Sequence, residues 1–426
     1  MGTSSPRRDF PVVGMVGGGQ LARMTQQAAI GLGQTLRVLA VAPDEPAPLV
    51  TPDVVPGHAD LAGLEALAVG CDAVTFDHEG VPQEHLRALV AKGVAVRPHP
   101  DALIHAQDKL VMRRRLAAMG LPIPAFAEIT SPEQVAEFGE AHGWPVVLKA
   151  ARGGYDGRGV WFLRSADSAD GTDSADGTSA GAPVRSLVAE LLAAGTPLLV
   201  EEAVAMRREL AAQVARSPFG QAAAWPVVET VQEDGQCVQV LAPAPGLAEE
   251  RALEAQGIAL RIAHELDVTG LLAVELFETD AGLLINELAM RPHNSGHWTI
   301  EGARTSQFEQ HLRAVLDYPL GTTTMTAPVV VMANVLGAEK TPEMTVDERI
   351  HHLFARFPEV KVHLYAKGER PLRKVGHVTV LGTDVAALAE VRRKAALAAD
   401  WLSTGEWSDG WSVHSGADVA ELGERA

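Results

Sequence analysis

The chain has 426 residues, of which 47% are hydrophobic and 21% are charged, a composition typical of a globular protein with two or three domains. Its formal net charge of −18 argues against general nucleic-acid binding, and no run approaches the roughly 20 apolar residues that a membrane helix needs. The first residues lack the apolar core of a signal peptide, and the two cysteines, Cys71 and Cys237, are typical of reduced thiols. We therefore expect a soluble cytoplasmic protein that captures anionic ligands with local clusters of Lys and Arg.

Short apolar strands alternate with helices in the first hundred residues. The strands are predicted at residues 11–16, 36–42 and 73–76, and this alternation predicts a parallel, doubly wound sheet. Gly17-x-Gly19-x-x-Ala22 follows the first strand and matches the dinucleotide fingerprint, with Asp44 at a suitable distance for a ribose contact. A tight strand-to-helix turn needs the same glycines. The motif thus leaves open an NAD-dependent oxidoreductase, a phosphate site for another ligand, and a turn without a ligand.

The remaining segments mix strands and helices in a different order. A basic helix is predicted at 108–119, strands at 146–149, 160–163 and 198–200, and a second helix at 247–266. Residues 165–183 repeat Ser-Ala-Asp and Asp-Gly-Thr and contain few apolar residues, which indicates a mobile surface insertion. From about 325 to 415, short strands near Val329, Val362 and Val378 and a helix at 384–399 predict a small α+β cap.

Two segments could bind the phosphates and the base of a nucleotide. Lys149 ends an apolar strand, and the glycine-rich run 153–159 after it would let backbone N–H groups approach an anion, although the order of a Walker motif is absent. A flexible hairpin tip is the alternative. Glu201, Glu202 and Glu209 follow the strand 198–200, either as solvated carboxylates or as part of a site that reads a base edge and the ribose hydroxyls.

Residues 271–278 and 283–288 are predicted to form a hairpin around Asp280-Ala-Gly282. If Thr279 pairs with Leu283, Glu275 lies directly opposite Glu287, with Cβ atoms about 4.5–5.5 Å apart. Two such carboxylates repel each other unless a divalent cation bridges them or one is protonated. Mg²⁺ suits all-oxygen ligands and usually brings substrate phosphates with it, so the pair indicates metal-dependent phosphate chemistry.

A cluster of donors follows this hairpin directly. Arg291, His293, Asn294 and His297 are better suited to a small oxyanion than to zinc, because no third ligand with suitable spacing is visible. Further on, residues 367–374 concentrate four cations before a strand. They form either a solvated turn or a phosphate clamp, and the clamp is favoured because the acidic chain has few other places to hold a phosphate.

Four motifs together resemble the ATP-grasp superfamily and, within it, the N5-carboxyaminoimidazole ribonucleotide synthetases of purine biosynthesis. They are GGGQLARM (17–24), GGYDGRG (153–159), INELAMRPHNSGHWT (285–299) and RKVGH (373–377). The resemblance spans about residues 11–410 and implies an α/β and α+β chain with an ATP-grasp fold. The implied parts are an N-terminal Rossmann-like (pre-ATP-grasp) domain at 1–105, an ATP-grasp domain at 106–320 with a mobile lid at about 125–205, and a small C-terminal α+β cap at 321–426.

The resemblance also implies the ligands of individual residues. ATP would be bound by Lys109, Lys149, Gly154, Tyr155, Asp156, Gly157, Arg158, Gly159, Val160, Glu201, Glu202, Ala203, Val204, Glu209, Gln232, Asn286 and Glu287. Mg²⁺ would be bound by Glu275 and Glu287, and bicarbonate by Arg291, His293 and Asn294. Aminoimidazole ribonucleotide would be bound by Gln20, Glu79, Tyr155, Arg158, Lys367, Arg373 and Lys374.

The implied reaction is the ATP-dependent carboxylation of 5-aminoimidazole ribonucleotide with bicarbonate, through carboxyphosphate, to N5-carboxyaminoimidazole ribonucleotide, ADP and phosphate. Asp156 is the candidate acceptor of the amine proton, and the family suggests a homodimer. Three places depart from the family pattern: Gln232 replaces a histidine, Leu372 replaces a glycine, and Phe76-Asp-His-Glu-Gly80 replaces the commoner Phe-Glu-x-Glu-Asn, with Glu79 as the retained carboxylate. The alternatives are an ATP-grasp ligase that activates formate or an amino acid, the NAD-dependent oxidoreductase, and a non-catalytic nucleotide-binding protein.

Overall fold

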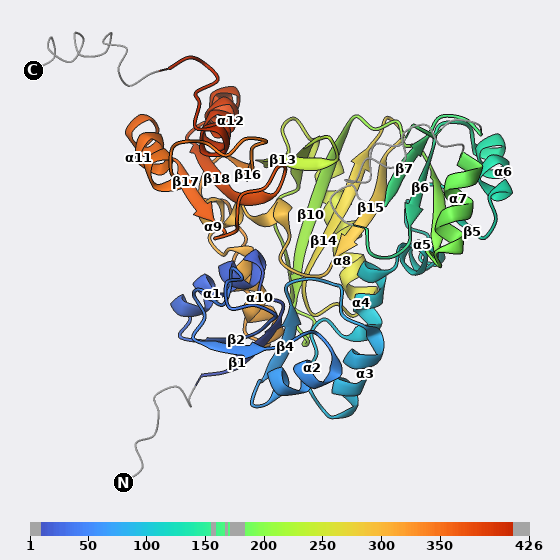
Figure 1. Cartoon of the computed structure of the whole chain (residues 1–426), viewed down its shortest axis with the longest axis horizontal. Coiled ribbons are helices and arrows are strands. Elements are labelled where there is room, and N and C mark those ends of the chain that lie inside the picture. The colour runs from blue at the N-terminus through green and yellow to red at the C-terminus, as the bar shows by residue number, and fades with distance from the viewer. Residues whose placement is uncertain (1–9, 155–158, 167–168, 171–183, 412–426) are drawn as a thin grey trace, which may run out of the picture.

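The structure of the chain, a computed structural model, describes residues 10–154, 159–166, 169–170 and 184–411. It contains three sheets of four, nine and five strands. Figure 1 shows the N-terminal sheet at the bottom and the five-stranded sheet on the right, whereas the nine-stranded sheet runs from the centre to the upper left, where the C-terminal helices lie. In the described part of the chain, no helix is long and apolar enough to cross a membrane.

The N-terminal sheet is parallel, in the order β3-β2-β1-β4, as the alternation of strands and helices predicted. Its strands are β1 (Val12–Val16), β2 (Thr35–Ala40), β3 (Asp53–Pro56) and β4 (Ala73–Phe76), and its helices are α1 (Gln20–Gly31), α2 (Leu61–Ala68), α3 (Gln83–Ala91) and α4 (Pro100–Gln107). Strands β1 and β4 are apolar and almost wholly buried, as is typical of parallel sheets covered on both faces. Because β1 and β4 are parallel neighbours, the residues after them, Gly17–Gln20 and Asp77–Glu79, lie side by side.

The nine-stranded sheet is antiparallel, in the order β15-β14-β10-β12-β13-β16-β18-β17, with β11 beside β10. Its strands are β10 (Arg208–Arg216), β11 (Ala222–Ala224), β12 (Val228–Glu233), β13 (Gln236–Ala242), β14 (Gly270–Glu278), β15 (Leu283–Ala289), β16 (Val329–Leu336), β17 (Lys361–Leu364) and β18 (Lys374–Gly382). The C-terminal segment predicted as a cap does not form a sheet of its own. Its strand β16 pairs with β13 and so extends the central sheet.

Helices cover both faces of the central sheet. They are α5 (Lys109–Ala118), α8 (Glu249–Glu265), α9 (Thr299–Gly302), α10 (Gln307–Val315), α11 (Val346–Arg356) and α12 (Leu388–Thr404). Alternate residues of a strand point to opposite faces, and Leu210 of β10 lies in the same core as Ile258 of α8, whereas Ala211 lies in the same core as Ala314 of α10. Helix α12 packs on β16 and β18.

The five-stranded sheet coincides with the segment predicted as a lid. Its order is β5-β9-β6-β7-β8, with strands β5 (Phe126–Ile129), β6 (Val146–Ala150), β7 (Val160–Leu163), β8 (Ala169–Asp170) and β9 (Leu198–Glu202) and helices α6 (Glu133–His142) and α7 (Val184–Ala193). Except for β8, these elements contribute to a hydrophobic core of their own. Within the predicted insertion, Ala169 and Asp170 pair with β7, and the rest of 165–183 lies mostly outside the described residues.

Helix α10 joins the N-terminal sheet to the central one. It packs against α1 on one side and against β14 and β10 on the other (Figure 1). Nε2 of its buried His311 lies 2.8 Å from Oγ1 of Thr75 in β4, and burial lowers the pKa of His311 to about 3, so the ring is neutral. The contact between α10 and β4 therefore contains a buried hydrogen bond between uncharged side chains.

The hairpin of β14 and β15 is present, but its register beside the turn differs from the predicted one. Glu278, not Thr279, pairs with Leu283. Thr279 lies in the loop, where its hydroxyl oxygen accepts hydrogen bonds from the N–H groups of Ala281 and Gly282. The hydroxyl of Thr279 thus forms hydrogen bonds within the loop, an alternative to strand pairing that is typical of threonine.

A β-bulge then changes the register by one residue. Leu276 pairs with Ile285, whereas the next pair is Glu275 with Glu287, so that Asn286 is the extra residue. The predicted opposition of Glu275 and Glu287 is therefore confirmed, although the uniform register from which it was predicted is wrong.

Candidate active site

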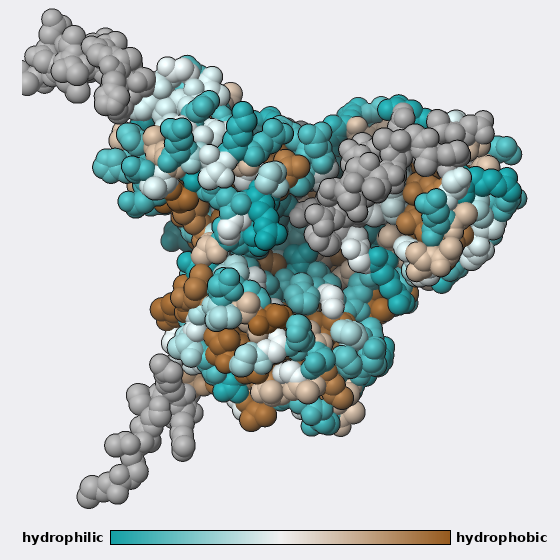
Figure 2. Space-filling model, in the orientation of Figure 1, coloured by the Kyte–Doolittle hydropathy of each residue, from teal (hydrophilic) through white to brown (hydrophobic). Residues whose placement is uncertain are grey.

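A cavity of about 1460 Å³ opens between the three sheets. Figure 2 shows that the hollow at the centre of this face is lined mainly by hydrophilic residues. The volume exceeds the roughly 300–1,000 Å³ of a pocket for one drug-sized ligand, so there is room for a nucleotide and a second substrate. Each of the three sheets, or the loops beside it, contributes residues, among them Gln20 and Glu79, Lys149 and Gly154, Glu275 and Arg291, and Lys374.

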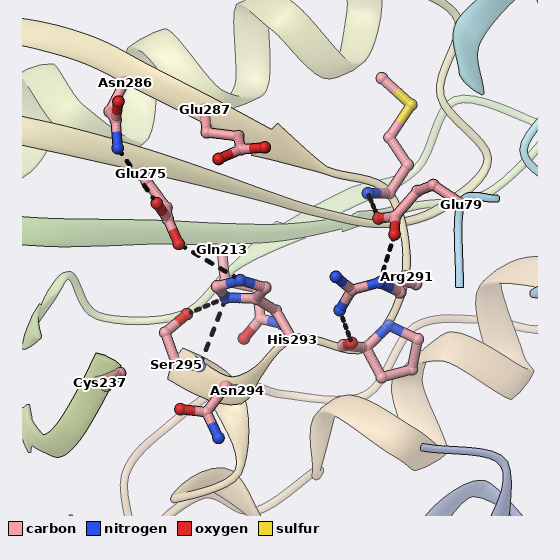
Figure 3. Close-up of polar contacts among 12 residues, drawn as sticks. Glu79, Gln213, Cys237, Glu275, Asn286, Glu287, Arg291, His293, Asn294 and Ser295 are labelled. Carbon is pink, nitrogen blue, oxygen red and sulfur yellow. Dashed lines mark hydrogen bonds and ion pairs between the residues drawn. The ribbon is translucent and has the colours of Figure 1, made fainter. Parts of the chain in front are cut away.

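The two opposed carboxylates lie in this cavity (Figure 3). Burial, followed by the charges of Glu287 and Glu209, raises the pKa of Glu275 to about 7. The compensating groups beside the pair are Nζ of Lys109, 2.7 Å from Oε1 of Glu287, and two nitrogens at 3.4 Å from Glu275, Nδ2 of Asn286 and Nε2 of His293. The negative charge here exceeds what these neighbours neutralise, so the pair favours a bound cation.

The donor set fits Mg²⁺ better than zinc. Among the described residues, no group of three or more His, Cys, Asp or Glu side chains is arranged to hold a metal ion. The structure therefore gives no support to a zinc site at His293 and His297. Two carboxylates with oxygen ligands only are suited to Mg²⁺, which takes its remaining ligands from phosphates and water.

Lys149 and Glu201 form part of a buried ion-pair triad. Oε1 of Glu201 accepts a hydrogen bond from Nε of Arg113 at 2.6 Å, and Oε2 accepts one from Nζ of Lys149 at 2.7 Å. Burial alone would raise the pKa of Glu201, but the two cations outweigh it and lower the pKa to about 2. Nζ of Lys149 also lies 3.3 Å from Oδ1 of Asn286, so the triad aims this ammonium at the bulge beside the carboxylate pair.

Arg291 and Glu79, which were predicted to serve different ligands, form an ion pair with each other. Nε of Arg291 donates to Oε2 of Glu79 at 2.6 Å (Figure 3). Burial would lower the pKa of Arg291, but Glu79, Asp77 and Glu287 raise it. The guanidinium therefore keeps its charge at the cavity wall, which an anion-binding role requires.

His293 and Asn294 are held by neighbours on several sides. Nε2 of His293 lies 3.4 Å from Oε1 of Glu275, and its Nδ1 lies 2.8 Å from Oγ of Ser295 (Figure 3). The amide of Asn294 pairs with that of Asn334, with one hydrogen bond in each direction at 3.0 and 2.9 Å. An amide nitrogen carries a second hydrogen, so Asn294 keeps some capacity to donate to a ligand.

A carboxylate of the chain itself occupies the position where the dinucleotide fingerprint would bind phosphate. The side chain of Asp77 accepts hydrogen bonds from the N–H groups of Gly19 at 2.7 Å and Ala22 at 2.9 Å at the start of α1. A Cβ on Gly19 would lie 2.2 Å from this carboxylate, so the glycine makes room for Asp77. Because this anion site is filled, the structure argues against the NAD-dependent oxidoreductase.

The structure brings most of the predicted site residues to the cavity. Those that line it are Gln20, Glu79, Lys109, Lys149, Gly154, Val160, Glu209, Gln232, Glu275, Asn286, Glu287, Arg291, His293, Asn294 and Lys374. Gly159, Glu201, Glu202, Ala203, Val204, Lys367 and Arg373 do not line it. Tyr155, Asp156, Gly157 and Arg158 lie outside the described residues.

The predicted phosphate clamp is therefore only partly assembled at the cavity. Lys367 lies over the ring of Tyr365 at 5.9 Å, and Arg373 donates to the carbonyl of Gly368. Leu372, which replaces a glycine of the family pattern, adopts φ +61°, a left-handed conformation that favours glycine.

Three residues that hold the site in place by hydrogen bonds were not predicted from the sequence: Asp77, Arg113 and Gln307. Arg113 was assigned only to a basic helix, yet it is buried and also donates to the carbonyls of Ile285 and Asn286. Its neighbour Arg114 is exposed. In the sequence, only the spacing of the apolar residues along the helix could have indicated which of the two arginines lies on the buried face.

Comparison with known proteins gives three matching family models. They are the ribonucleotide synthetase preATP-grasp domain at 11–107, the ATP-grasp domain at 114–308 and the phosphoribosylaminoimidazole carboxylase C-terminal domain at 330–391. N5-carboxyaminoimidazole ribonucleotide synthase of Mycobacterium tuberculosis is 61% identical over 412 residues, which cover 96% of this chain and 92% of that protein.

Solved structures are similar over nearly the whole chain. The N5-carboxyaminoimidazole ribonucleotide synthetase of Thermus thermophilus has a TM-score of 0.77 at 34% identity, with 94% of this chain and 100% of that chain covered. The enzyme of Aspergillus clavatus, in complex with ADP and 5-aminoimidazole ribonucleotide, has a TM-score of 0.79 at 30% identity, with 92% and 98% covered.

Proposed function

Since the chain belongs to the family of N5-carboxyaminoimidazole ribonucleotide synthases, which are ATP-grasp enzymes, we propose that its cavity holds ATP, bicarbonate and aminoimidazole ribonucleotide together. N5-carboxyaminoimidazole ribonucleotide synthesis in purine biosynthesis is the activity of this family, and the chain has it. The arrangement that carries the proposal is the carboxylate pair Glu275 and Glu287 beside Arg291 and His293 in one cavity.

ATP lies between the five-stranded sheet and the central sheet. Lys109, Lys149 and the backbone of Gly154 are the groups that face its phosphates, and Glu209 is the carboxylate for the ribose. Burial raises the pKa of Glu209, which lies near Gln232, and its carboxylate oxygens can accept hydrogen bonds from the ribose hydroxyl groups. The bound ADP of the Aspergillus clavatus relative supports nucleotide binding in the cavity.

Glu275 and Glu287 are the residues that would hold Mg²⁺. Burial and the charge of Glu287 raise the pKa of Glu275, a bound cation would offset both effects, and the two carboxylates supply the oxygen ligands that Mg²⁺ prefers. When bound, Mg²⁺ would neutralise phosphate charge and lower the barrier to phosphoryl transfer. Lys109 would then be released from Glu287 to contact the phosphates.

Bicarbonate binds to Arg291 and His293, with Asn294 beside them. Glu79 binds Nε of Arg291, and the guanidinium of Arg291 lines the cavity, where its positive charge can contact the anion. A bicarbonate oxygen attacks the γ-phosphorus of ATP, and the bond between that phosphorus and the β,γ-bridging oxygen breaks, so that carboxyphosphate and ADP form. Catalysis of this step consists mainly of positioning and charge neutralisation.

Carboxyphosphate then releases CO₂ and phosphate within the closed cavity, where water is excluded. The amine of aminoimidazole ribonucleotide attacks the carbon of CO₂ and loses a proton, for which Asp156 is the proposed acceptor. Gln20, Glu79 and Lys374 line the cavity on the side of this substrate, and Tyr155, Arg158, Lys367 and Arg373 remain proposed contacts. We also propose a homodimer, which sedimentation of the purified protein would test.

The test is ADP release by the purified full-length chain with each substrate omitted in turn. We expect ADP release to require aminoimidazole ribonucleotide and bicarbonate and to be indifferent to formate. Release that requires formate, or an amino acid in place of bicarbonate, would instead identify a different ATP-grasp ligase.

A further inference from the structure

The side-chain amide of Gln307 lies behind the loop that carries the proposed bicarbonate residues. Gln307 is the first residue of α10 and is fully buried. Its Oε1 accepts hydrogen bonds from the backbone N–H of His293 at 2.8 Å and from Nε2 of Gln213 at 2.7 Å. Its Nε2 donates to the carbonyl oxygen of His293 at 2.8 Å and lies 2.8 Å from Nδ1 of His297. The amide thus uses both of its acceptor positions and both of its donor positions.

The backbone of His293 fixes the orientation of this amide. A peptide N–H only donates and a peptide carbonyl only accepts, so Oε1 of Gln307 must face the N–H and Nε2 must face the carbonyl. The second hydrogen of Nε2 then needs Nδ1 of His297 as its acceptor. Burial and the neighbouring cationic groups hold the pKa of His297 well below its usual range, so the ring is neutral and Nδ1 can accept.

Gly296 shows how closely the loop wraps around the two glutamines. A Cβ at this position would lie 2.3 Å from Oε1 of Gln213 and 2.5 Å from Oε1 of Gln307. The 3-10 turn η2 (Asn294–Gly296) can therefore approach the amides only because it ends in glycine. Buried amides from β10 and α10 thus determine the shape of the loop.

We propose that Gln307 is a positioning residue for bicarbonate: its amide holds the backbone of His293 on both sides and so sets the direction from which His293 and Arg291 reach the anion. Gln307 itself does not line the cavity. The role rests on the assignment of bicarbonate to this loop. The ring of His293 contacts both Ser295 and Glu275, so a small shift of its backbone changes both contacts, and a displacement of about 1 Å can cost on the order of a hundredfold in rate.

Gln310, one helical turn further along α10, provides a matched control. It is equally buried, and its amide holds another backbone in the same way: Oε1 accepts from the N–H of Gly321 and Nε2 donates to its carbonyl, both at 2.8 Å. Neither Gln310 nor Gly321 lines the cavity. Methionine has nearly the length of glutamine without its hydrogen-bonding groups. Gln310→Met therefore removes the two hydrogen bonds to the backbone of Gly321, as Gln307→Met removes the two to the backbone of His293 together with those to Gln213 and His297.

The test is steady-state ADP release by the full-length wild type, Gln307→Met, Gln310→Met and Arg291→Met, with ATP, bicarbonate and aminoimidazole ribonucleotide each varied. We expect Gln307→Met to raise the KM for bicarbonate at least tenfold and to leave the KM for ATP within twofold. Gln310→Met should leave all three KM values within twofold, although it also lowers the thermal stability because it removes two buried hydrogen bonds.

Two outcomes separate this role from the function on which it rests. If Arg291→Met raises the KM for bicarbonate and Gln307→Met does not, the positioning role of Gln307 is wrong. If neither does, the assignment of bicarbonate to this loop is wrong. Should Gln307→Met fail to fold, Gln213→Met removes only one of the four hydrogen bonds and should raise the KM for bicarbonate about threefold. An unchanged value in that variant would overturn the role of the buried amides.

Discussion

Two consecutive arginines of α5 form ion pairs that differ mainly in burial, and together they give a test of the triad at the cavity wall. Arg113 and Glu201 are 1% and 2% exposed, with Nε and Oε1 2.6 Å apart. Arg114 and Glu128 are 58% and 47% exposed, with Nη2 and Oε2 2.5 Å apart. The substitutions Glu201→Gln and Glu128→Gln therefore remove one carboxylate charge each, one in the core and one at the surface.

The pKa of Glu201 gives the magnitude to expect. Arg113 and Lys149 lower it from 4.5 to about 2, and at about 1.4 kcal/mol per pKa unit this corresponds to about 3 kcal/mol of stability at neutral pH. Glu201→Gln also leaves two buried cations without their carboxylate, so we expect a loss of about 3–5 kcal/mol. Glu128→Gln should cost less than about 1 kcal/mol, because exposed pairs contribute little.

The assay is urea unfolding at several pH values, followed by tryptophan fluorescence. Because folding lowers the pKa of Glu201, its stabilisation is present above about pH 4.5 and is lost as the pH falls towards 2. The difference in the free energy of unfolding between the wild type and Glu201→Gln should therefore shrink by roughly 1 kcal/mol when the pH is lowered to about 3.5. A cost below about 1 kcal/mol at neutral pH, or an advantage that does not shrink on acidification, would refute the reasoning.

Three further outcomes follow from the cavity and the clamp. Glu287→Gln should lower kcat at least about a hundredfold and leave Tm within about 3 °C, because only the charge at the proposed metal site changes; wild-type turnover would contradict the metal assignment. Lys109→Met removes the ammonium group that lies 2.7 Å from Glu287. In calorimetry without nucleotide, this variant should bind Mg²⁺ about tenfold more tightly than the wild type. An unchanged affinity would show that Lys109 does not compete with the metal. Leu372→Gly should stabilise the chain by up to about 1 kcal/mol in urea unfolding, because a φ of +61° costs leucine about 1–2 kcal/mol. Glycine loses part of this gain because the unfolded chain becomes more flexible. A loss of stability would instead mean that the leucine side chain has a packing role.

The parallel N-terminal sheet and the carboxylate hairpin could be predicted because both depend on local patterns. Buried strands such as β1 and β4 are short apolar runs between turn residues, and the hairpin loop limits which residues can face each other. Even so, the bulge at Asn286 could not be predicted, because one extra residue leaves the alternation of side chains readable on either side of it.

The supporting residues could not be predicted because their partners are distant in the sequence. Gln307 is an ordinary polar residue at the start of a helix until β10 and the loop after β15 are placed beside it. Likewise, Gly17 to Ala22 matches a dinucleotide fingerprint, and only the three-dimensional structure shows that Asp77 fills the anion site. A local motif indicates which backbone shape is present, and not which group occupies it.

The bulge at Asn286 also bears on how the hairpin can change during evolution or in design. It places the turn and the carboxylate pair in registers that differ by one residue. Replacing the loop at 279–282 with one of another length would disturb the pairs near Leu283, and the bulge could absorb a one-residue slip before it reaches Glu287. Deleting Asn286 itself would merge the two registers and so remove this tolerance.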